Sequence, residues 1–324
     1  MDALSDVLRV IRLSGGVFLE AQFTAPWCIN GRISPEDCAA FQVLPRHVIT
    51  SHFVASGQMQ LKVGDEVLNV RAGELVLLPH NDVHIFGSEL SVAPISARDV
   101  MQPAPSGDLM RIVHGGDGEM TQVLCGFLGT NNSFGPLLSS LPSVLKLDLR
   151  ATPSGSWIES SFRFAISQIA AGRVGSTTVI AKLSELLFVE AVSHYIAGLP
   201  DDRQGWLAGL RDPHIGRALN LLHASPAKAW SAESLAAEVG MSRSGFAERF
   251  TTLVGQPPMQ YLACWRMQLA GQRLRESRET IAQVGFSVGY ESEAAFSRAF
   301  KRVLGVSPGA ARRQAAASPA WSRS

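Results

Sequence analysis

The chain has 324 residues, of which 46% are hydrophobic and 18% are charged, and its formal net charge at pH 7 is +1. This length predicts two or three compact units, and the composition excludes a disordered or fibrous protein. There is no uninterrupted apolar run of about 18 residues and no secretory leader pattern, so we expect a cytoplasmic protein without a membrane span.

Charge is unevenly distributed along the chain. Residues 1–204 carry a net charge of −6, with 14 Lys and Arg against 20 Asp and Glu. Residues 205–324 carry +7, with 15 basic residues against 8 acidic ones. A basic segment joined to an acidic one indicates that only the C-terminal part meets a polyanion. The alternative is a chance fluctuation of surface charge.

The first two thirds of the sequence combine short strands with helices. Apolar spacing over residues 1–12 predicts a short amphipathic helix. Residues 15–130 favour β structure, because Met59, Leu61 and Val63 alternate with polar residues and are followed by glycine-containing turns. Such short strands indicate a barrel or a sandwich. The segment 103–118 is rich in Pro and Gly and is expected to be a loop.

Two helices are expected between residues 155 and 198. In the second, Ile180, Leu183, Leu187 and Ala191 recur at helical spacing, which predicts either a core stripe or a dimer seam. Asp201 to Gly209 is a plausible linker because it is polar and contains glycine. The chain is then expected to be helical to about residue 313, with a disordered tail over 314–324.

The C-terminal region contains an internal repeat. Phe246, Phe250, Gly255 and Pro258 recur 50 residues later. Their counterparts are Phe296, Phe300, Gly305 and Pro308. A repeat at a fixed period predicts a duplicated supersecondary unit.

Each copy has the start and stop signals of two short helices. In the first copy Ser231 and Ser242 can cap the helices, and Gly240 can form the turn between them. In the second copy Thr280 with Gln283 forms a capping-box pattern, followed by a turn at Gly289 and a cap at Ser292. The phenylalanines then face inward, which leaves a small and polar outer face. This arrangement is typical of a helix-turn-helix.

The outer faces predict contacts with a DNA major groove. Alanines at 247, 294 and 295 let a helix approach the bases, and Arg298 can form a forked contact with guanine. Arg249, Lys301 and Arg302 are expected at phosphate oxygens. The residues expected to contact DNA are Ser242, Arg243, Ser244, Ala247, Glu248 and Arg249 in the first copy, and Ser292, Glu293, Ala294, Ser297, Arg298, Lys301 and Arg302 in the second.

A long helix is expected between the two copies. It begins at Pro257-Pro258, and Tyr261, Trp265 and Leu274 lie on one apolar face. Such a helix fixes the distance between two reading heads, which must lie about 34 Å apart to reach one face of B-DNA.

Residues of about 210–313 resemble the DNA-binding domain of the AraC/XylS family of transcription regulators. The matching motifs are LAAEVGMSRSGFAERF, YLACWRMQLAGQRL and VGYESEAAFSRAFKRVLGVSPGAAR. The resemblance implies two helix-turn-helix subdomains that read consecutive major grooves of double-stranded DNA. It places the base-reading positions at Ser244, Ala247 and Glu248 and at Ala294, Ala295 and Arg298. It also implies RNA polymerase as a partner and a homodimer, with the stripe at 180–191 as the seam.

The N-terminal region resembles the cupin-type sensor domain found in one branch of that family. Residues 68–87 match the second cupin motif at Gly73, Pro79 and His84, with Asn81 where Gly is usual, and TQVLCGFLG also matches. The first motif is poor, since Ile49 and Thr50 stand where metal ligands are expected. The residues expected to line an effector pocket are Trp27, Cys28, His47, His80 and His84.

Metal and redox chemistry remain alternatives for this domain. The imidazoles of His47, His52, His80 and His84 and the thiolate of Cys28 have the donor types of a zinc site, although we expect no cofactor. The cysteines form no CxxC pair, which favours reduced thiols. Cys28 as an oxidation sensor is a hypothesis that requires an exposed thiolate of low pKa, whereas Cys125 is expected to be a small core residue.

The sequence therefore predicts an α+β protein. We expect a cupin-like β-barrel over residues 1–135, a helical linker or dimerisation segment over 136–204, a double helix-turn-helix domain over 205–313 and a tail over 314–324. The predicted function is a DNA-binding transcription regulator, an activator that is gated by a small effector or an oxidant and is not an enzyme. The alternatives are a cupin metalloenzyme with a DNA-binding appendage and an effector-free DNA-binding protein.

Overall fold

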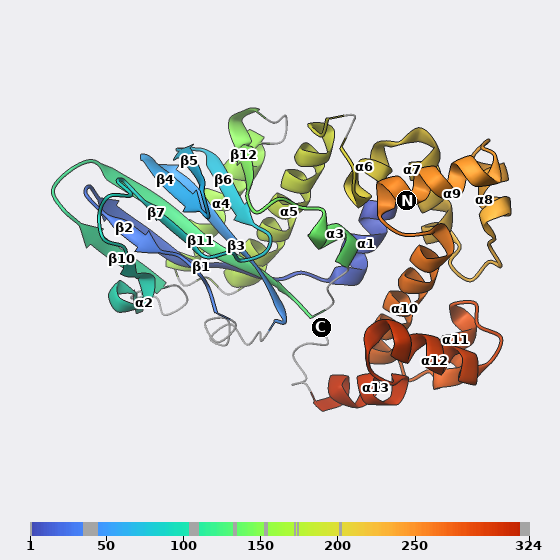
Figure 1. Cartoon of the computed structure of the whole chain (residues 1–324). Helices are drawn as coiled ribbons and strands as arrows, with labels where there is room; N and C mark the ends of the chain where they lie inside the picture. The colour runs from blue at the N-terminus through green and yellow to red at the C-terminus, as the bar shows by residue number, and fades with distance from the viewer. Residues whose placement is uncertain are drawn as a thin grey trace. The chain divides into compact units, whose positions relative to one another are not determined.

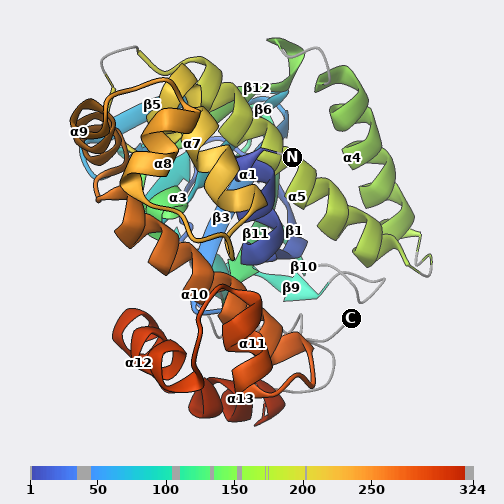
Figure 2. The same ribbon diagram turned by 90° about the vertical axis from the view of Figure 1, so that its right-hand side faces the viewer.

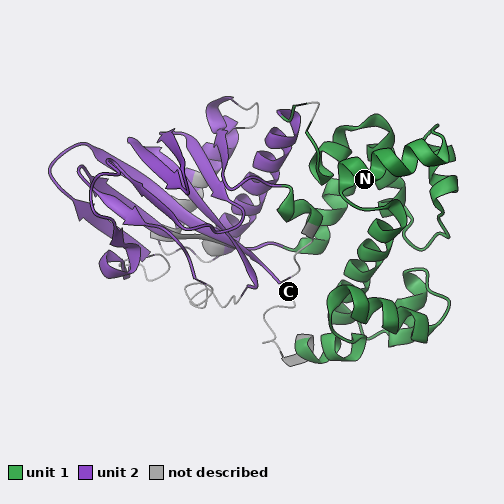
Figure 3. Ribbon diagram, in the orientation of Figure 1, with its two compact units in different colours: residues 1–12, 134–140, 199–324 green, residues 13–133, 141–198 purple. Residues whose placement is uncertain are grey.

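The computed structural model of the chain describes residues 2–34, 45–103, 110–131, 135–151, 155–171, 173, 175–200 and 203–317. It divides into two compact units (Figure 1, Figure 3). The sensor unit comprises residues 13–133 and 141–198, and the DNA-binding unit comprises residues 1–12, 134–140 and 199–324. None of the helices in the described part of the chain is both long and apolar enough to cross a membrane.

These units differ from the boundaries expected from the sequence. The amphipathic helix predicted at the N-terminus is present as α1 (Ala3–Ile11), but it packs against helices of the DNA-binding unit. The main-chain N–H of Ala3 donates to Asn220 Oδ1 at 2.8 Å, and Arg12 pairs with Glu276 at 3.1 Å. Residues 141–198, expected to form a separate linker, group with the strands.

The sensor unit is built from two hydrogen-bonded sheets. The larger has the order β12 (Leu145–Asp148), β6 (Glu74–Leu78), β3 (His47–Ser56), β11 (Met120–Thr130), β1 (Ser14–Thr24), β10 (Met110–Gly115) and β9 (Gln102–Pro103). The smaller has the order β5 (Glu66–Arg71), β4 (Gln58–Val63), β7 (His84–Gly87), β2 (Cys28–Asn30) and β8 (Ile95–Ser96). The strands expected to form a barrel thus form two sheets rather than one closed sheet.

Side chains from both sheets form one apolar core. Met59, Leu61 and Val63 of β4 are buried together with Leu19 of β1 and Val54 of β3. The alternation predicted for residues 58–63 is therefore confirmed. The prediction of a loop over 103–118 is wrong for residues 110–115, which form β10 and pair in parallel with β1. Their backbone groups are satisfied by the sheet despite the flanking glycines.

Two long helices accompany the larger sheet. They are α4 (Gly155–Ala170) and α5 (Ser176–Ala197), and α5 packs against β1, β11 and β12. Ile180, Leu187 and Ala191 are buried within this chain. Leu183 is partly buried. Most of the stripe at 180–191 is therefore core, which argues against it as a dimer seam.

The DNA-binding unit is helical. Its elements are α1, α3 (Gly135–Ser139), α6 (Trp206–Arg211), α7 (Pro213–Ala224), α8 (Ala232–Glu238), α9 (Arg243–Val254), α10 (Pro258–Glu276), α11 (Ile281–Ser287), α12 (Glu293–Leu304) and α13 (Pro308–Ala317). In Figure 2, α10 runs from the α7–α9 group to the α11–α13 group. Helix α6 begins within the expected linker, at Trp206, and α13 continues through residues 314–317 of the expected tail. Residues 318–324 lie outside the described residues.

The predicted helix caps are present in both motifs. Ser242 Oγ accepts the main-chain N–H of Gly245, and Ser292 Oγ accepts that of Ala295. Thr280 and Gln283 form the reciprocal capping box. Because these caps satisfy N–H groups at the helix ends, they define where each helix begins.

The two helix-turn-helix motifs are joined at Arg266 as well as through the length of α10. The Arg266 guanidinium donates to the carbonyl oxygens of Pro226 at 2.7 Å and Lys228 at 2.9 Å, and it lies 5.9 Å from the Tyr290 ring centroid. Gly289 (φ +85°) lies so close that an added Cβ would be 2.6 Å from the Ala227 carbonyl oxygen. We call residues 226–228, Arg266 and residues 289–290 the Arg266 junction.

Replacing Arg266 should weaken this junction. We expect Arg266→Met to lower the free energy of unfolding of the DNA-binding unit by roughly 1–3 kcal/mol, because two carbonyls lose a charged donor. Arg273→Met on the same helix is the control, since its half-exposed ion pair with Glu279 spans 3.9 Å and should contribute less than about 1 kcal/mol. Urea unfolding of the full chain measures both, and equal losses would contradict the bridging role.

Candidate nucleic-acid interface and sensor pocket

The first helix-turn-helix consists of α8 and α9. Phe246 and Phe250 are buried beneath α9, as predicted, and their rings meet edge to face at 5.6 Å between centroids. Arg243, Ser244 and Glu248 are exposed, and Ala247 is partly exposed. The face expected to meet DNA is therefore the solvent face of α9.

The second motif, α11 with α12, repeats this geometry. Phe296 and Phe300 are buried, with their ring centroids 5.5 Å apart. The remaining predicted residues lie on the other face, where Ser292, Glu293, Ala294, Arg298, Lys301 and Arg302 are exposed and Ser297 is partly exposed. Among the described residues, the side chains of Arg298 and Lys301 have no hydrogen-bond or ion-pair partner. Both cations are therefore available to an external anion.

Arg249 differs from the other basic side chains of these helices. Its guanidinium donates to Asp212 Oδ2 from Nε at 2.8 Å and from Nη2 at 2.5 Å. The other oxygen of Asp212 caps α7 by accepting the N–H groups of His214 and Ile215. These contacts lower the pKa of Asp212 against the effect of its partial burial. Arg249 thus links α9 to α7. Its guanidinium is already paired, whereas it was expected to be available to a DNA phosphate.

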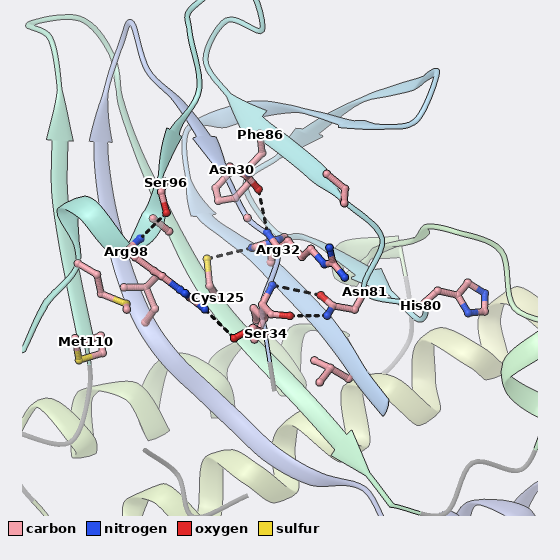
Figure 4. A pocket seen from close by; sticks show the side chains of 18 of the residues that line it. Asn30, Arg32, Ser34, His80, Asn81, Phe86, Ser96, Arg98, Met110 and Cys125 are labelled. Atoms are coloured by element: carbon pink, nitrogen blue, oxygen red, sulfur yellow. Dashed lines mark hydrogen bonds between the residues drawn. The ribbon is translucent and has the colours of Figure 1, made fainter. Parts of the chain in front are cut away.

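The sensor unit contains a cavity of about 810 Å³ (Figure 4). Its walls come from β1, β3, β7, β11, from α2 (Ala97–Val100) and from residues 30–34. This volume is within the range of pockets that enclose small molecules. The lining combines aliphatic side chains and methionines with arginine, histidine and amide groups.

Two of the five residues predicted for this pocket line it. His47 and His80 do so, and their Nε2 atoms lie 2.7 Å and 3.1 Å from the carbonyl oxygens of Pro79 and Leu141. Trp27, Cys28 and His84 do not line it, so the prediction was wrong for these three residues. Trp27 is stacked on Phe23 inside the core, with ring centroids 4.0 Å apart.

Cys28 lacks the properties that oxidation sensing would require. Its side chain is buried where β2 pairs with β7, opposite Gly87. Burial raises the pKa of the Cys28 thiol, so the thiol is protonated near neutral pH. A reactive cysteine needs an accessible thiolate of low pKa. The structure therefore argues against the Cys28 hypothesis.

His84 belongs to a buried hydrogen-bond relay whose other two members, His52 and Cys125, line the pocket. Its Nδ1 lies 2.8 Å from the Asp82 carbonyl oxygen, its Nε2 lies 2.8 Å from His52 Nε2, and His52 Nδ1 lies 3.1 Å from Cys125 Sγ. A carbonyl can only accept, so His84 donates from Nδ1 and accepts at Nε2. His52 then donates from Nε2 and accepts the Cys125 thiol proton at Nδ1. Burial lowers the pKa of both histidines, which keeps them neutral as this relay requires.

The relay does not fit a metal centre. His52 presents different ring nitrogens to His84 and to Cys125, so no single ion can take all three groups. Thr50, which stands at a ligand position of the cupin pattern, donates its hydroxyl to Asn81 Oδ1 at 2.7 Å. Among the residues that the structure describes, no group of three or more His, Cys, Asp or Glu side chains could hold a metal ion.

Gly31 separates His84 from the cavity. A Cβ at position 31 would lie 2.4 Å from His84 Nε2 and 2.6 Å from a ring carbon of Phe86. The backbone can pass over the imidazole only because residue 31 lacks a side chain. This close approach explains why the cupin-motif histidine is buried and does not line the pocket.

The residues that the sequence analysis missed are Arg32, Arg46 and Arg98, together with the role of Asn81. Asn81 has a left-handed backbone (φ +52°), which explains the preference for Gly at this position and is tolerated by Asn. Its side chain donates to the Ile33 carbonyl oxygen at 2.6 Å and so holds residues 31–34 at the pocket. No periodic pattern marks these arginines, because they lie on irregular segments and a very short helix.

Comparison with known families finds one family in each part of the chain. Residues 2–197 match the family model described as cupin, and residues 235–314 match that described as a helix-turn-helix domain. The first match covers more than half of the chain. Both families expected from the sequence are therefore found, each in the expected part of the chain.

Two curated relatives are similar to the chain over almost its whole length. A putative AraC-like transcription regulator of Streptomyces lividans is 32% identical over 95% of this chain and 97% of its own length. The HTH-type transcriptional regulator AlkR of Acinetobacter baylyi is 30% identical over 95% and 98%. A crystal structure of the AdpA DNA-binding domain with a target DNA is 32% identical over 32% of this chain and 92% of that one, with a TM-score of 0.31. Because of the family matches and the identity to the two full-length relatives, the chain belongs to the AraC-like transcription regulators that join an N-terminal cupin domain to a C-terminal helix-turn-helix domain.

Proposed function

We propose that α9 and α12 enter consecutive major grooves of one DNA duplex, and that a small effector in the sensor pocket gates this binding. The observation that carries the proposal is the repeated geometry of the two motifs. Each has paired phenylalanines buried beneath it and a solvent face of small and polar side chains. The DNA-binding unit is also the basic part of the chain.

The second motif supplies the stronger base contact. Arg298 has the planar fork that recognises guanine, and Ala294 leaves room for close approach to the bases. Lys301 and Arg302 lie further along the same helix and bind phosphate oxygens, which gives affinity without sequence preference. Ser242 and Ser292 accept main-chain N–H groups as caps, and their hydroxyl protons are left for phosphates.

The first motif reads fewer bases. Its outward residues at the base-reading positions are Ser244, Ala247 and Glu248, of which only the serine can donate to a base acceptor. Arg243 is exposed at the start of α9, where it can bind phosphate. Arg249 is held by Asp212 and therefore positions α9 against α7.

In this proposal the regulator is associated with the bacterial nucleoid and activates transcription by contacting RNA polymerase. The cavity of about 810 Å³ supports effector binding, because a constitutive DNA-binding protein needs no pocket of this size. The metalloenzyme alternative is not favoured, because the curated relatives are transcription regulators. An effector-free regulator is separated from a gated one by the ligand experiment below.

We also propose a homodimer, through α4 instead of the 180–191 stripe. Trp157 and Phe164 lie two helical turns apart on α4 and are about 60% exposed. Large aromatic side chains are costly to leave in water and are enriched at protein interfaces. The same aromatic face on a second copy would cover them.

Selection from random duplex DNA tests two-headed reading. The full chain at physiological salt should enrich two short blocks about one helical turn apart, with the block read by α12 better defined. A single enriched block would contradict reading by both motifs.

Substitutions on α12 test the separate roles of its basic residues. Arg298→Ala should cost on the order of 1–3 kcal/mol of binding and relax specificity at one position. Lys301→Ala should weaken binding to all sequences alike and lower the salt slope by about one. Titration of matched and mismatched duplexes at several salt concentrations measures both. If Arg298→Ala weakened binding to every sequence equally, Arg298 would contact the DNA backbone and not a base.

Charged substitutions on α4 test the proposed dimer surface. A Trp157→Glu, Phe164→Glu double variant should sediment as a monomer, because the carboxylates would be buried without partners at the interface. Val67→Glu is the control, since Val67 is half exposed on β5. An unchanged dimer in the double variant would remove α4 as the interface.

A further inference from the structure

We propose that the sensor pocket binds an organic anion, with a carboxylate or phosphate head held by arginines and an apolar body directed into the sensor core. This inference rests on the proposed function, in which the pocket holds the effector. It adds the chemical class of that effector.

The charge of the pocket lining is the first observation that supports an anionic ligand. Arg32, Arg46 and Arg98 line it, and no Asp or Glu is among its described lining residues. Asp82 and Asp99 adjoin lining residues in the sequence without lining the cavity themselves. The charge of the pocket lining is therefore opposite to that of residues 1–204 as a whole, which carry a net charge of −6. A basic pocket in an acidic domain selects anions over cations.

Two of the three arginine side chains are available to a ligand. Those of Arg32 and Arg46 make no hydrogen bond or ion pair with any described residue. Arg98 donates from Nη2 to Ser34 Oγ at 2.7 Å, a bond drawn in Figure 4. A guanidinium has five N–H donors in a planar fork that matches the oxygens of a carboxylate or a phosphate. Charge-assisted bonds of this kind are stronger than those between neutral groups.

The segment that carries these groups is held in place before a ligand arrives. Asn81 bonds to the main chain of Ile33, and Gly31 N–H donates to the His84 carbonyl oxygen at 3.1 Å. The Arg98–Ser34 bond joins the same segment to α2. Binding therefore requires less ordering of residues 31–34, which favours affinity.

The remainder of the lining is apolar or neutral. Leu19, Phe86, Met101 and Met110 contribute to it, and Figure 4 shows Met110 and Cys125 among the lining side chains. Methionines adapt to irregular apolar shapes. His52 also lines the cavity, but its hydrogen bonds to His84 and Cys125 are already made, so it offers no free charge. The lining therefore suits a hydrocarbon body attached to the anionic head.

Isothermal titration of the full chain tests the ligand class with four probes of one chain length. These are octanoate, octyl phosphate, octan-1-ol and octyltrimethylammonium. We expect at least one anion to bind roughly tenfold or more tightly than both the alcohol and the cation, which corresponds to about 1.4 kcal/mol. The two anions identify the preferred head. Equal binding of octanol, or tighter binding of the ammonium probe, would overturn the proposal.

Variants locate the bound anion. Arg32→Gln and Arg46→Gln should each weaken binding of the preferred anion about tenfold, through loss of a charge-assisted contact. The matched control is Arg71→Gln, an exposed arginine at the end of β5 that does not line the pocket. Thermal unfolding of each variant shows whether the fold is retained. If folded Arg32→Gln and Arg46→Gln proteins both bind as tightly as the control, the arginines do not hold the head.

Affinity for the selected DNA site, measured with and without the probe, separates this inference from the proposed function. Specific DNA binding with no anion binding would overturn the ligand class and leave the DNA-binding function intact. Anion binding without any change in DNA affinity would support the ligand class and contradict effector gating.

Discussion

The geometry of the DNA-binding unit depends on one arginine that bonds to the backbone of a neighbouring loop. Two major grooves on one face of DNA have a fixed spacing, so two reading helices are useful only if their separation is also fixed. Helix α10 sets the length, but a single helix leaves rotation at each end unconstrained. The Arg266 junction removes that freedom, because it joins the loop before α8 to the turn between α11 and α12. The close approach at Gly289 leaves no space for a side chain that would separate the motifs.

The sequence was most informative where structure depends on local signals. Caps at Ser242 and Thr280 and phenylalanines at helical spacing predict the helices, because helix ends and amphipathic faces are encoded within a few residues. A duplicated pattern strengthened each assignment. The Arg266 junction had no such signal, since its partners are carbonyl groups some forty residues away. The Arg249–Asp212 pair was missed for the same reason.

The sensor pocket was predicted less well because its residues come from segments without a period. Histidine is a frequent ligand, and this favoured His84, but the close packing of Gly31 places that side chain in the interior. The arginines that line the cavity lie on irregular segments and on the very short helix α2. Gly31 thus covers only His84, whereas the other two members of the relay, His52 and Cys125, line the arginine-lined cavity. The relay satisfies its own hydrogen bonds, which leaves recognition to the flanking segment.

Helix α1 has a consequence for how the protein is made. It is the first element to be synthesised, yet its apolar face packs on α7 and α10 of the DNA-binding unit. At common rates of translation these partners follow roughly ten to fifty seconds later. During that interval the sensor strands can pair while Val7, Val10 and Ile11 remain uncovered. The DNA-binding unit is therefore completed only at the end of synthesis, and a nascent regulator cannot bind DNA before its sensor unit has been synthesised.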